Sequence, residues 1–261
     1  MNDQLERARL LYQQKRYDLS LKEIIEVLSV EPRHDEAHIL RGLCLTLTDN
    51  QQEGLKAVQR AISINPESPY AYNCLAYIYQ ILGDLVAAKN AVDRAIALEP
   101  TNPSFRLRLA QIVNTLCYHD KTQLEPLLLA LNLEVDLSLT PEAQFHALNK
   151  IVIHMADRVL EIDPENVDAL YLRLNALYAL NSLKKLEAGC YNLLQIEPNH
   201  MLTYNMLGII YQKRQRWSES IKFFRTALSI DPNYLDANIN LNVSYIENDK
   251  TYNLLCALSK T

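Results

Sequence analysis

Apolar residues recur along most of the chain at steps of three and four residues, the spacing that lines one face of an α-helix. In two blocks this helical pattern returns every 34 residues. Each repeat ends at a proline that is preceded by an apolar residue and then an acidic residue or asparagine. These prolines are Pro32, Pro66, Pro100, Pro164, Pro198 and Pro232. Proline lacks the N–H group that a helix needs and disfavours helical geometry in the preceding residue. Each repeat is therefore predicted to hold two short helices, the second of which ends near the proline.

Other positions keep the same period. A small or apolar residue recurs in the first helix of each repeat, at Ala8, Gly42, Ala76, Ala110, Leu174 and Gly208. Small side chains at a crossing let neighbouring helices approach closely. Ser68-Pro69 and Asn102-Pro103 place a hydrogen-bond acceptor before a proline, which predicts the start of a helix.

The last full repeat, residues 201–233, shows the pattern most clearly, with Tyr204, Leu207, Gly208, Tyr211, Trp217, Ser220, Phe224, Ala227 and Pro232 at the recurring positions. On these residues the chain resembles the tetratricopeptide repeat family. It departs from the family's usual alanine at Ser20, Gly54, Leu186 and Ser220. The resemblance implies an all-α fold, in which antiparallel helix pairs stack into a right-handed superhelical solenoid of about six to seven repeats. The first helix of each pair lines the inner, concave face.

The repeat pattern breaks in residues 117–163, because the interval from Pro100 to Pro164 is 64 residues, one repeat plus 30. A short helix is expected within 120–134, and Thr140-Pro141-Glu142 predicts the start of a long helix that runs to Ile162. We expect residues 1–116 to hold three repeats and the first helix of the fourth. Residues 117–163 hold a divergent insertion with an extended second helix, and 164–261 hold two repeats and capping helices. One continuous domain is expected.

Two interpretations of the insertion stay open. It either bends the solenoid as a degenerate repeat, or forms a functional protrusion that binds a partner or folds into the groove. At the C-terminus, a first-helix pattern over 235–249 and a short helix over 251–260 are predicted. The second of these either closes the core or supports self-association.

The stretch 34–38, HDEAH, places two histidines four residues apart around carboxylates, as in a zinc hydrolase helix. The period instead puts it in the turn between repeats, with His34 before the helix start, and its glutamate is two residues after that histidine rather than one. His146 and His154 lie about 12 Å apart along a predicted helix, too far for one ion. We expect no catalytic, cofactor-binding or metal-binding residues. A metal-dependent hydrolase remains an alternative that stoichiometric zinc would support.

Composition agrees with a helical protein. Hydrophobic residues make up 49% of the 261, and there are only 5 glycines, whereas phosphate-cradling enzymes use more of them. The net charge of -5 and pI of about 5.7 argue against nucleic acid as the main partner. No secretory signal or membrane-spanning run is apparent. Five widely spaced cysteines without a CxxC pair predict reduced thiols in a cytoplasmic protein.

Positions at steps of three and four residues along the first helices are predicted to form an inner surface that is rich in tyrosine and amide side chains. The residues are Ile39, Leu43, Tyr70, Asn73, Tyr77, Gln80, Gln111, Tyr171, Asn175, Tyr178, Asn205, Ile209 and Gln212. Tyrosine offers apolar area with a polar tip, and amides can pair with both backbone groups of a bound segment. We therefore predict a groove for a peptide segment or helix of a partner protein. Packing of the same side chains between repeats is the alternative.

Within the family, one well-known groove clamps the acidic C-terminal tails of heat-shock chaperones with lysine, arginine and asparagine on three successive first helices. The corresponding positions here carry Leu5 and Arg9, then Leu40, then Tyr70 and Cys74, so this clamp is not expected. The sequence predicts a non-enzymatic protein-interaction scaffold without a cofactor. The alternative is a chaperone or adaptor dedicated to one macromolecular assembly.

Overall fold

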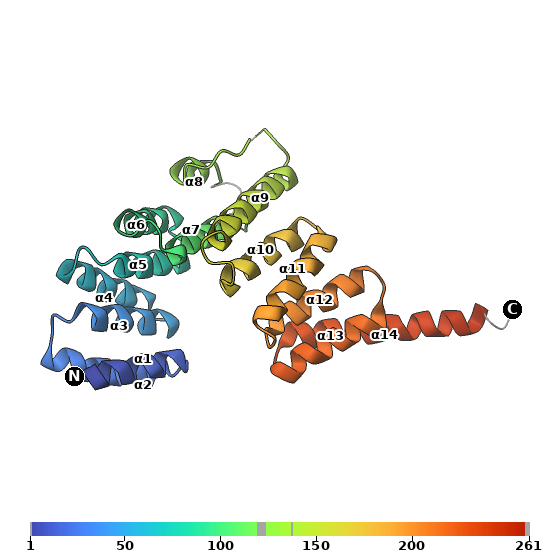
Figure 1. Ribbon diagram of the computed structural model, residues 1–261, viewed down its shortest axis with the longest axis horizontal. Helices are drawn as coiled ribbons and strands as arrows, with labels where there is room; N and C mark the ends of the chain where they lie inside the picture. The colour runs from blue at the N-terminus through green and yellow to red at the C-terminus, as the bar shows by residue number, and fades with distance from the viewer. Residues whose placement is uncertain (1, 119–123, 137, 259–261) are drawn as a thin grey trace. The chain divides into compact units, whose positions relative to one another are not determined.

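In the computed structural model the chain is helical throughout its regular structure (Figure 1). The structure describes residues 2–118, 124–136 and 138–258; Asn2, Pro126, Ala130 and residues 251–258 are described by their backbone only. The helices are α1 (Asn2–Gln13), α2 (Tyr17–Val30), α3 (Asp35–Leu47), α4 (Gln51–Ile64), α5 (Pro69–Ile81), α6 (Leu85–Leu98), α7 (Pro103–Leu116), α8 (Leu124–Ala130), α9 (Pro141–Leu160), α10 (Val167–Ala179), α11 (Leu183–Ile196), α12 (Met201–Lys213), α13 (Trp217–Ile230) and α14 (Leu235–Leu258). The predicted all-α fold is confirmed.

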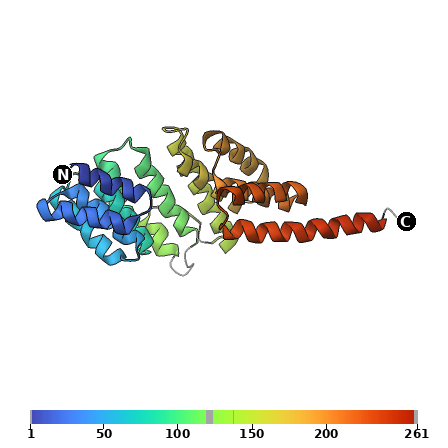
Figure 2. The same cartoon turned by 90° about the horizontal axis from the view of Figure 1, so that it is seen from below.

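Consecutive helices form pairs, and the pairs stack. α1 packs on α2, α3 on α4, α5 on α6, α10 on α11 and α12 on α13. Second helices also contact the first helix of the following pair, as α2 does α3 and α11 does α12. Two compact units result, Met1–Ile162 with α1 to α9 and Asp163–Thr261 with α10 to α14. Figure 2 shows the pairs of the first unit, coloured from blue to green. The predicted boundaries after residues 116 and 163, and the single continuous domain, stay predictions.

The fourth repeat contains the expected insertion. α7 packs against α9, so α9 takes the place of the second helix, whereas α8 contacts α6. The hydroxyl of Thr140 accepts a hydrogen bond from the Ala143 N–H at 3.3 Å, and Pro141 opens the first turn of α9. The predicted start of this long helix agrees with the structure; its end lies at Leu160, two residues before the predicted Ile162.

The C-terminal segment differs from the prediction of two helices over 235–249 and 251–260, because α14 is one helix. No proline or glycine interrupts the sequence between the two predicted parts, so the helical hydrogen bonds continue. α14 exposes a row of apolar side chains at helical steps: Leu235, Ile239, Val243 and Ile246. The side chains of the second predicted helix, which either close the core or support self-association, lie outside the described residues; they include Leu254, Leu255, Cys256 and Leu258. Self-association through this helix stays a prediction.

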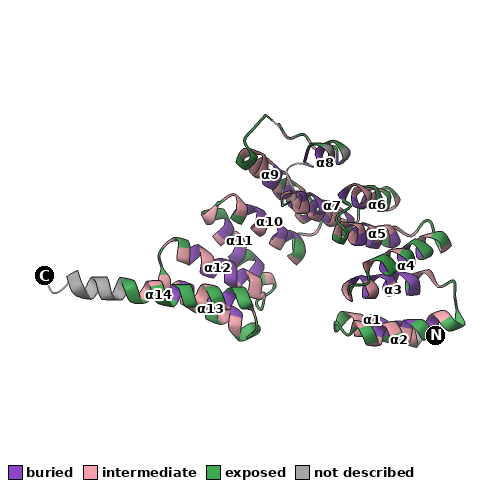
Figure 3. Ribbon diagram, turned by 180° about the vertical axis from the view of Figure 1, so that it is seen from behind, coloured by how far each residue is buried: buried purple, intermediate pink, exposed green. Residues whose placement is uncertain are grey.

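The core consists of clusters that each span neighbouring repeats. One cluster joins α1, α2 and α3 around Ile24 and Val27, and the next joins α3, α4 and α5 around Ile39, Val58 and Ile78. Figure 3 shows the buried residues along the facing sides of the paired helices. A helix pair therefore buries its apolar face only when its neighbour is present. No helix among the described residues has both the length and the apolarity needed to cross a bilayer.

The turn within a repeat has one recurring backbone form. In each of these turns one residue has left-handed backbone geometry, with φ between 51° and 81°. These residues are Lys15, Asp49, Gly83, Asn181 and Gln215. At the first of these, the Arg16 N–H donates to the Leu11 carbonyl and the Lys15 N–H to the Tyr12 carbonyl, both at 2.9 Å. This pair of bonds satisfies carbonyl groups at the helix end and reverses the chain. The two helices of a pair therefore run antiparallel.

The closest approach of α3 and α4 is at a glycine pair. A Cβ atom on Gly54 would lie 2.7 Å from the backbone oxygen of Gly42 and 2.4 Å from Oγ1 of Thr46. A backbone oxygen cannot rotate away, so this crossing requires glycine. At Gly189, by contrast, the nearest atom to an added Cβ is Cδ2 of Leu174 at 2.6 Å, at the flexible end of a side chain.

Replacing Gly54 and Gly189 by alanine, one at a time, should change the stability of the protein differently. Both changes improve helix propensity by about 1 kcal/mol. We expect Gly54→Ala to lower stability by about 1–3 kcal/mol, because α3 and α4 must move apart. Gly189→Ala should leave stability unchanged or raise it. Thermal and urea denaturation followed by circular dichroism would measure both, and a Gly54→Ala protein as stable as the wild type would contradict the close approach.

Candidate functional site

The predicted inner-surface residues lie on first helices and divide between the two units. α3, α5 and α7 carry Ile39, Leu43, Tyr70, Asn73, Tyr77, Gln80 and Gln111, and α10 and α12 carry Tyr171, Asn175, Tyr178, Asn205, Ile209 and Gln212. Each set lies within a single unit. The structure brings only part of the first set together around an open space.

That space is a hollow of about 410 Å³ between α1, α3 and α5, named here the N-terminal hollow. It is lined by Arg9, Tyr12, Gln13, Glu36, Ile39, Leu40, Leu43 and Tyr70. Ile39, Leu43 and Tyr70 belong to the predicted binding surface, and Glu36, Arg9 and Leu40 were also expected on the inner face, whereas Tyr12 and Gln13 were not predicted. The 34-residue period contained the missing signal for Tyr12, which stands 68 residues before the predicted Gln80 and so occupies the same inward position two repeats earlier.

The N-terminal hollow has an apolar floor and a polar rim. Ile39 and Leu43 are 2% and 6% exposed and belong to a core cluster, so folding fixes the floor. Tyr70 is 54% exposed and is available to a ligand. At the rim, the Arg9 guanidinium donates to the carboxylates of both Glu36 and Glu6. The positive charge of Arg9 is therefore compensated within the rim.

The phenols and the thiol around this hollow stay protonated at neutral pH. Burial raises the pKa of Tyr12 to about 12 and that of Cys74 to about 12. The neighbouring Cys74 thiol, together with burial, raises the pKa of Tyr70. A protonated phenol can donate a hydrogen bond, and a protonated thiol is a poor nucleophile. Tyr12 and Tyr70 line the hollow and can hold a ligand, and none of the three groups is activated for covalent chemistry.

Further along the first unit, predicted inner-surface side chains bind neighbouring helices. Gln80 Nε2 donates to the Gln111 carbonyl oxygen at 3.1 Å and to Thr115 Oγ1 at 2.7 Å. The Arg108 guanidinium lies over the Tyr77 ring, 4.9 Å from its centroid. These contacts link α5 to α7. Tyr77, Gln80 and Gln111 therefore pack between repeats, which was the alternative to contact with a partner. Their contact with a partner stays a prediction.

The second unit repeats this arrangement. Gln212 Nε2 donates to the Asn240 carbonyl oxygen and to Ser244 Oγ, each at 2.9 Å. Asn205 donates to the Tyr234 hydroxyl at 3.2 Å and accepts from the Asn240 side chain at 3.2 Å. In both units a glutamine thus joins one first helix to the next through a carbonyl and a hydroxyl of the following repeat.

The remaining predicted residues are partly covered. The Lys213 ammonium lies 4.9 Å from the centroid of the Tyr178 ring, and the Tyr171 ring packs against His200 with centroids 5.1 Å apart. The other three predicted residues range from buried to half-buried: Asn73, Asn175 and Ile209.

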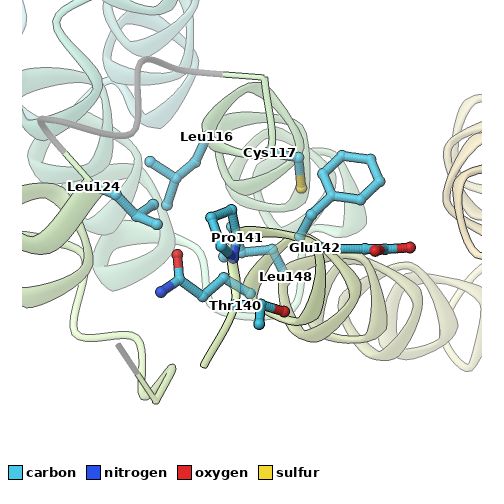
Figure 4. A pocket seen from close by; sticks show the side chains of 9 residues that line it. Leu116, Cys117, Leu124, Thr140, Pro141, Glu142 and Leu148 are labelled. Carbon is cyan, nitrogen blue, oxygen red and sulfur yellow. The ribbon is translucent and has the colours of Figure 1, made fainter. Parts of the chain in front are cut away.

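A second hollow, of about 540 Å³, lies beside the inserted helix (Figure 4). Residues at the adjoining ends of α7, α8 and α9 line it: Leu116, Cys117, Leu124, Thr140, Pro141, Glu142, Gln144, Phe145 and Leu148. The sequence did not predict this hollow, because its walls depend on how an insertion without a repeat pattern packs on α7 and α9.

The HDEAH stretch has the predicted role at a helix start. His34 caps α3, since its Nδ1 accepts a hydrogen bond from the Ala37 N–H at 3.4 Å. His38 is buried, and its Nε2 lies 3.0 Å from the Pro32 carbonyl oxygen. The two imidazoles therefore serve local contacts. Among the residues whose side chains are described, no three histidine, cysteine or acidic residues are close enough to hold a metal ion.

Comparisons with known proteins agree with the repeat pattern. Three tetratricopeptide repeat family models match residues 5–69, 57–90 and 202–234. The peroxisomal targeting signal receptors of Kluyveromyces lactis and Saccharomyces cerevisiae are 22% and 24% identical over 88% and 82% of this chain. The matches cover 36% and 31% of those receptors, so the chain spans about a third of the length of these curated relatives.

Solved structures share the fold at low sequence identity. A thermophilic tetratricopeptide repeat protein of Thermus thermophilus has a TM-score of 0.61 and 17% identity, covering 81% of this chain and 99% of its own. The human IFIT1 dimer with m7Gppp-AAAA has a TM-score of 0.72 and 15% identity, covering 92% of this chain and 53% of that chain. At these identities the likeness concerns the fold.

The histidine beside Tyr171 generates a pH prediction. Burial lowers the pKa of His200 below its ordinary value of 6.5. The unfolded chain therefore binds this proton more tightly, so His200 should lower the stability of the second unit as pH falls below about 6.5. We expect His200→Gln to reduce the loss of urea-unfolding stability between pH 7.5 and pH 5. A pKa of His200 at or above 6.5 in an NMR titration would contradict this.

Proposed function

The chain belongs to the tetratricopeptide repeat family, and from this premise we propose that it is a non-enzymatic scaffold that binds a segment of a partner protein in the N-terminal hollow. The observation that carries the proposal is the composition of that hollow. Three successive repeats contribute a fixed apolar floor, an exposed tyrosine and a hydrogen-bonding rim. Because one fold hosts many functions, the kind of partner has to follow from these side chains.

The size of the hollow suits an anchoring side chain. Its volume of about 410 Å³ falls within the range of roughly 300–1,000 Å³ that is usual for ligand sites. A leucine or aromatic side chain of the partner would cover Ile39, Leu40 and Leu43. Burial of such a side chain stabilises a complex by roughly 1.5–3 kcal/mol. Since the floor is already part of the core, little ordering cost is added on binding.

The rim favours an internal segment over a free carboxyl terminus. Arg9 already pairs with the carboxylates of Glu6 and Glu36, so its charge is compensated before a further carboxylate arrives. The Gln13 amide and the Tyr70 hydroxyl instead offer neutral donors and acceptors for a peptide backbone. This supports recognition of an apolar residue within a chain, in an extended or helical segment.

The curated relatives support the same class of function. By name they are receptors for a targeting signal. We extend to this chain only the binding of a short protein segment by a helical array. Dedication to a single macromolecular assembly stays a prediction, which a single stoichiometric partner would support.

The test is a comparison of partners captured from native cell extract by the wild type and by Tyr70→Ala. Exposed tyrosines at the centre of an interface often contribute 2 kcal/mol or more, so we expect recovery of direct partners to fall by about tenfold or more. Quantitative mass spectrometry measures the change. The affinity of a segment identified in this way is then measured by calorimetry with both proteins.

The matched control is Ile25→Ala, which truncates a side chain of similar exposure, 57% against 54%, on the second helix α2 of the same unit. Circular dichroism establishes that both variants fold. Recovery should be unchanged for the control. Equal recovery by wild type and Tyr70→Ala, or equal loss in both variants, would reject the N-terminal hollow as the binding site.

A further inference from the structure

The inserted segment forms a second apolar surface in the first unit. α8 ends at Ala130, and Asn132, two residues further on, has left-handed backbone geometry with a φ of 54°. The Leu133 N–H donates to the Leu128 carbonyl at 2.9 Å, and the Asn132 N–H donates to the Leu129 carbonyl at 3.1 Å. This pair of bonds is the same helix-ending motif that closes the intra-repeat turns. Here it returns the chain so that residues 133–136 line a groove together with α8.

The groove has a volume of about 520 Å³ and is named here the α8 groove. It is lined by Glu125, Leu128, Leu129, Leu133, Glu134, Val135 and Asp136. Leu128 is 3% exposed and belongs to the core, which anchors the groove to the first unit. The next residue, Leu129, is 83% exposed. Removing the apolar surface of a leucine from water is favourable, so a partner that covers Leu129 gains binding free energy.

The rim of the α8 groove is acidic. Glu125, Glu134 and Asp136 line it, and the sequence from 124 to 149 contains no lysine or arginine. The N–H and the hydroxyl of Ser138 both donate to Asp136 Oδ1 and lower the pKa of that carboxyl, so Asp136 is ionised at neutral pH. Carboxylates around an apolar surface attract basic partners and repel acidic ones.

We propose that the α8 groove docks a basic amphipathic segment of a partner protein. An apolar side chain of the segment packs against Leu129 and Leu133, while its lysine or arginine side chains meet the three carboxylates of the rim. This inference does not rest on the function proposed for the N-terminal hollow, because the two surfaces share no residue and differ in charge.

The probe is a fluorescein-labelled synthetic peptide of leucine and lysine, with the leucines at helical steps of three and four. Fluorescence anisotropy measures its dissociation constant for the full chain at low and at physiological salt. We expect Glu125→Lys/Glu134→Lys to weaken binding roughly tenfold, because two attractions become repulsions. Leu129→Ser should weaken binding several-fold at both salt concentrations, because its contribution is apolar. A peptide with glutamate in place of every lysine should not bind.

The matched control is Glu26→Lys/Glu31→Lys, which changes the net charge equally at exposed positions in and just beyond α2. Circular dichroism establishes that each variant folds, and the high exposure of Leu129 makes its replacement structurally mild. We expect the control to bind the probe as the wild type does. If the control weakens binding as much as Glu125→Lys/Glu134→Lys does, the peptide is attracted by the overall charge of the protein and the proposal is overturned. Unchanged affinity in either groove variant also overturns it.

Discussion

In the described repeats of the first unit, helix pairs bury their apolar faces against the neighbouring repeat, and the stacking of the pairs follows from that constraint. The cluster around Ile24 needs α3 from the next repeat, and the cluster around Val58 needs α5. Each repeat is therefore stabilised by its neighbours, and the contacts that matter most are close in sequence. The same clusters include Ile39 and Leu43, so the floor of the N-terminal hollow is itself part of the core.

The 34-residue period made the helices predictable because it repeats both the apolar steps and the helix ends. The helix caps at Ser68 and Thr140 could be predicted from the sequence because a side-chain hydrogen-bond acceptor directly precedes a proline. Two parts could not be read in this way. The length of α14 depends on the absence of a helix breaker near Lys250, and the α8 groove lies in the insertion of the fourth repeat. Neither the long helix nor the insertion follows the 34-residue period, so periodicity carried no information about them.

For the candidate site, sequence placed residues on the correct helices but could not distinguish a free side chain from an engaged one. Gln80 and Gln212 look like binding residues, and both donate to the neighbouring repeat. Such pairing depends on a carbonyl and a hydroxyl about 30 residues away, which a single position does not reveal. These bonds are directional, so they set the angle between successive first helices before any partner arrives. The inner surface is accordingly shaped by folding rather than by binding.

The intra-repeat turns have a consequence for how this chain tolerates change over evolutionary time. Lys15, Asp49, Asn181 and Gln215 carry side chains in a backbone region that Gly83 occupies without a Cβ atom. Each such side chain costs on the order of 1 kcal/mol, less for asparagine and aspartate. Glycine adopts this geometry without the steric cost of a Cβ atom, so these turns are positions at which a substitution could stabilise the array.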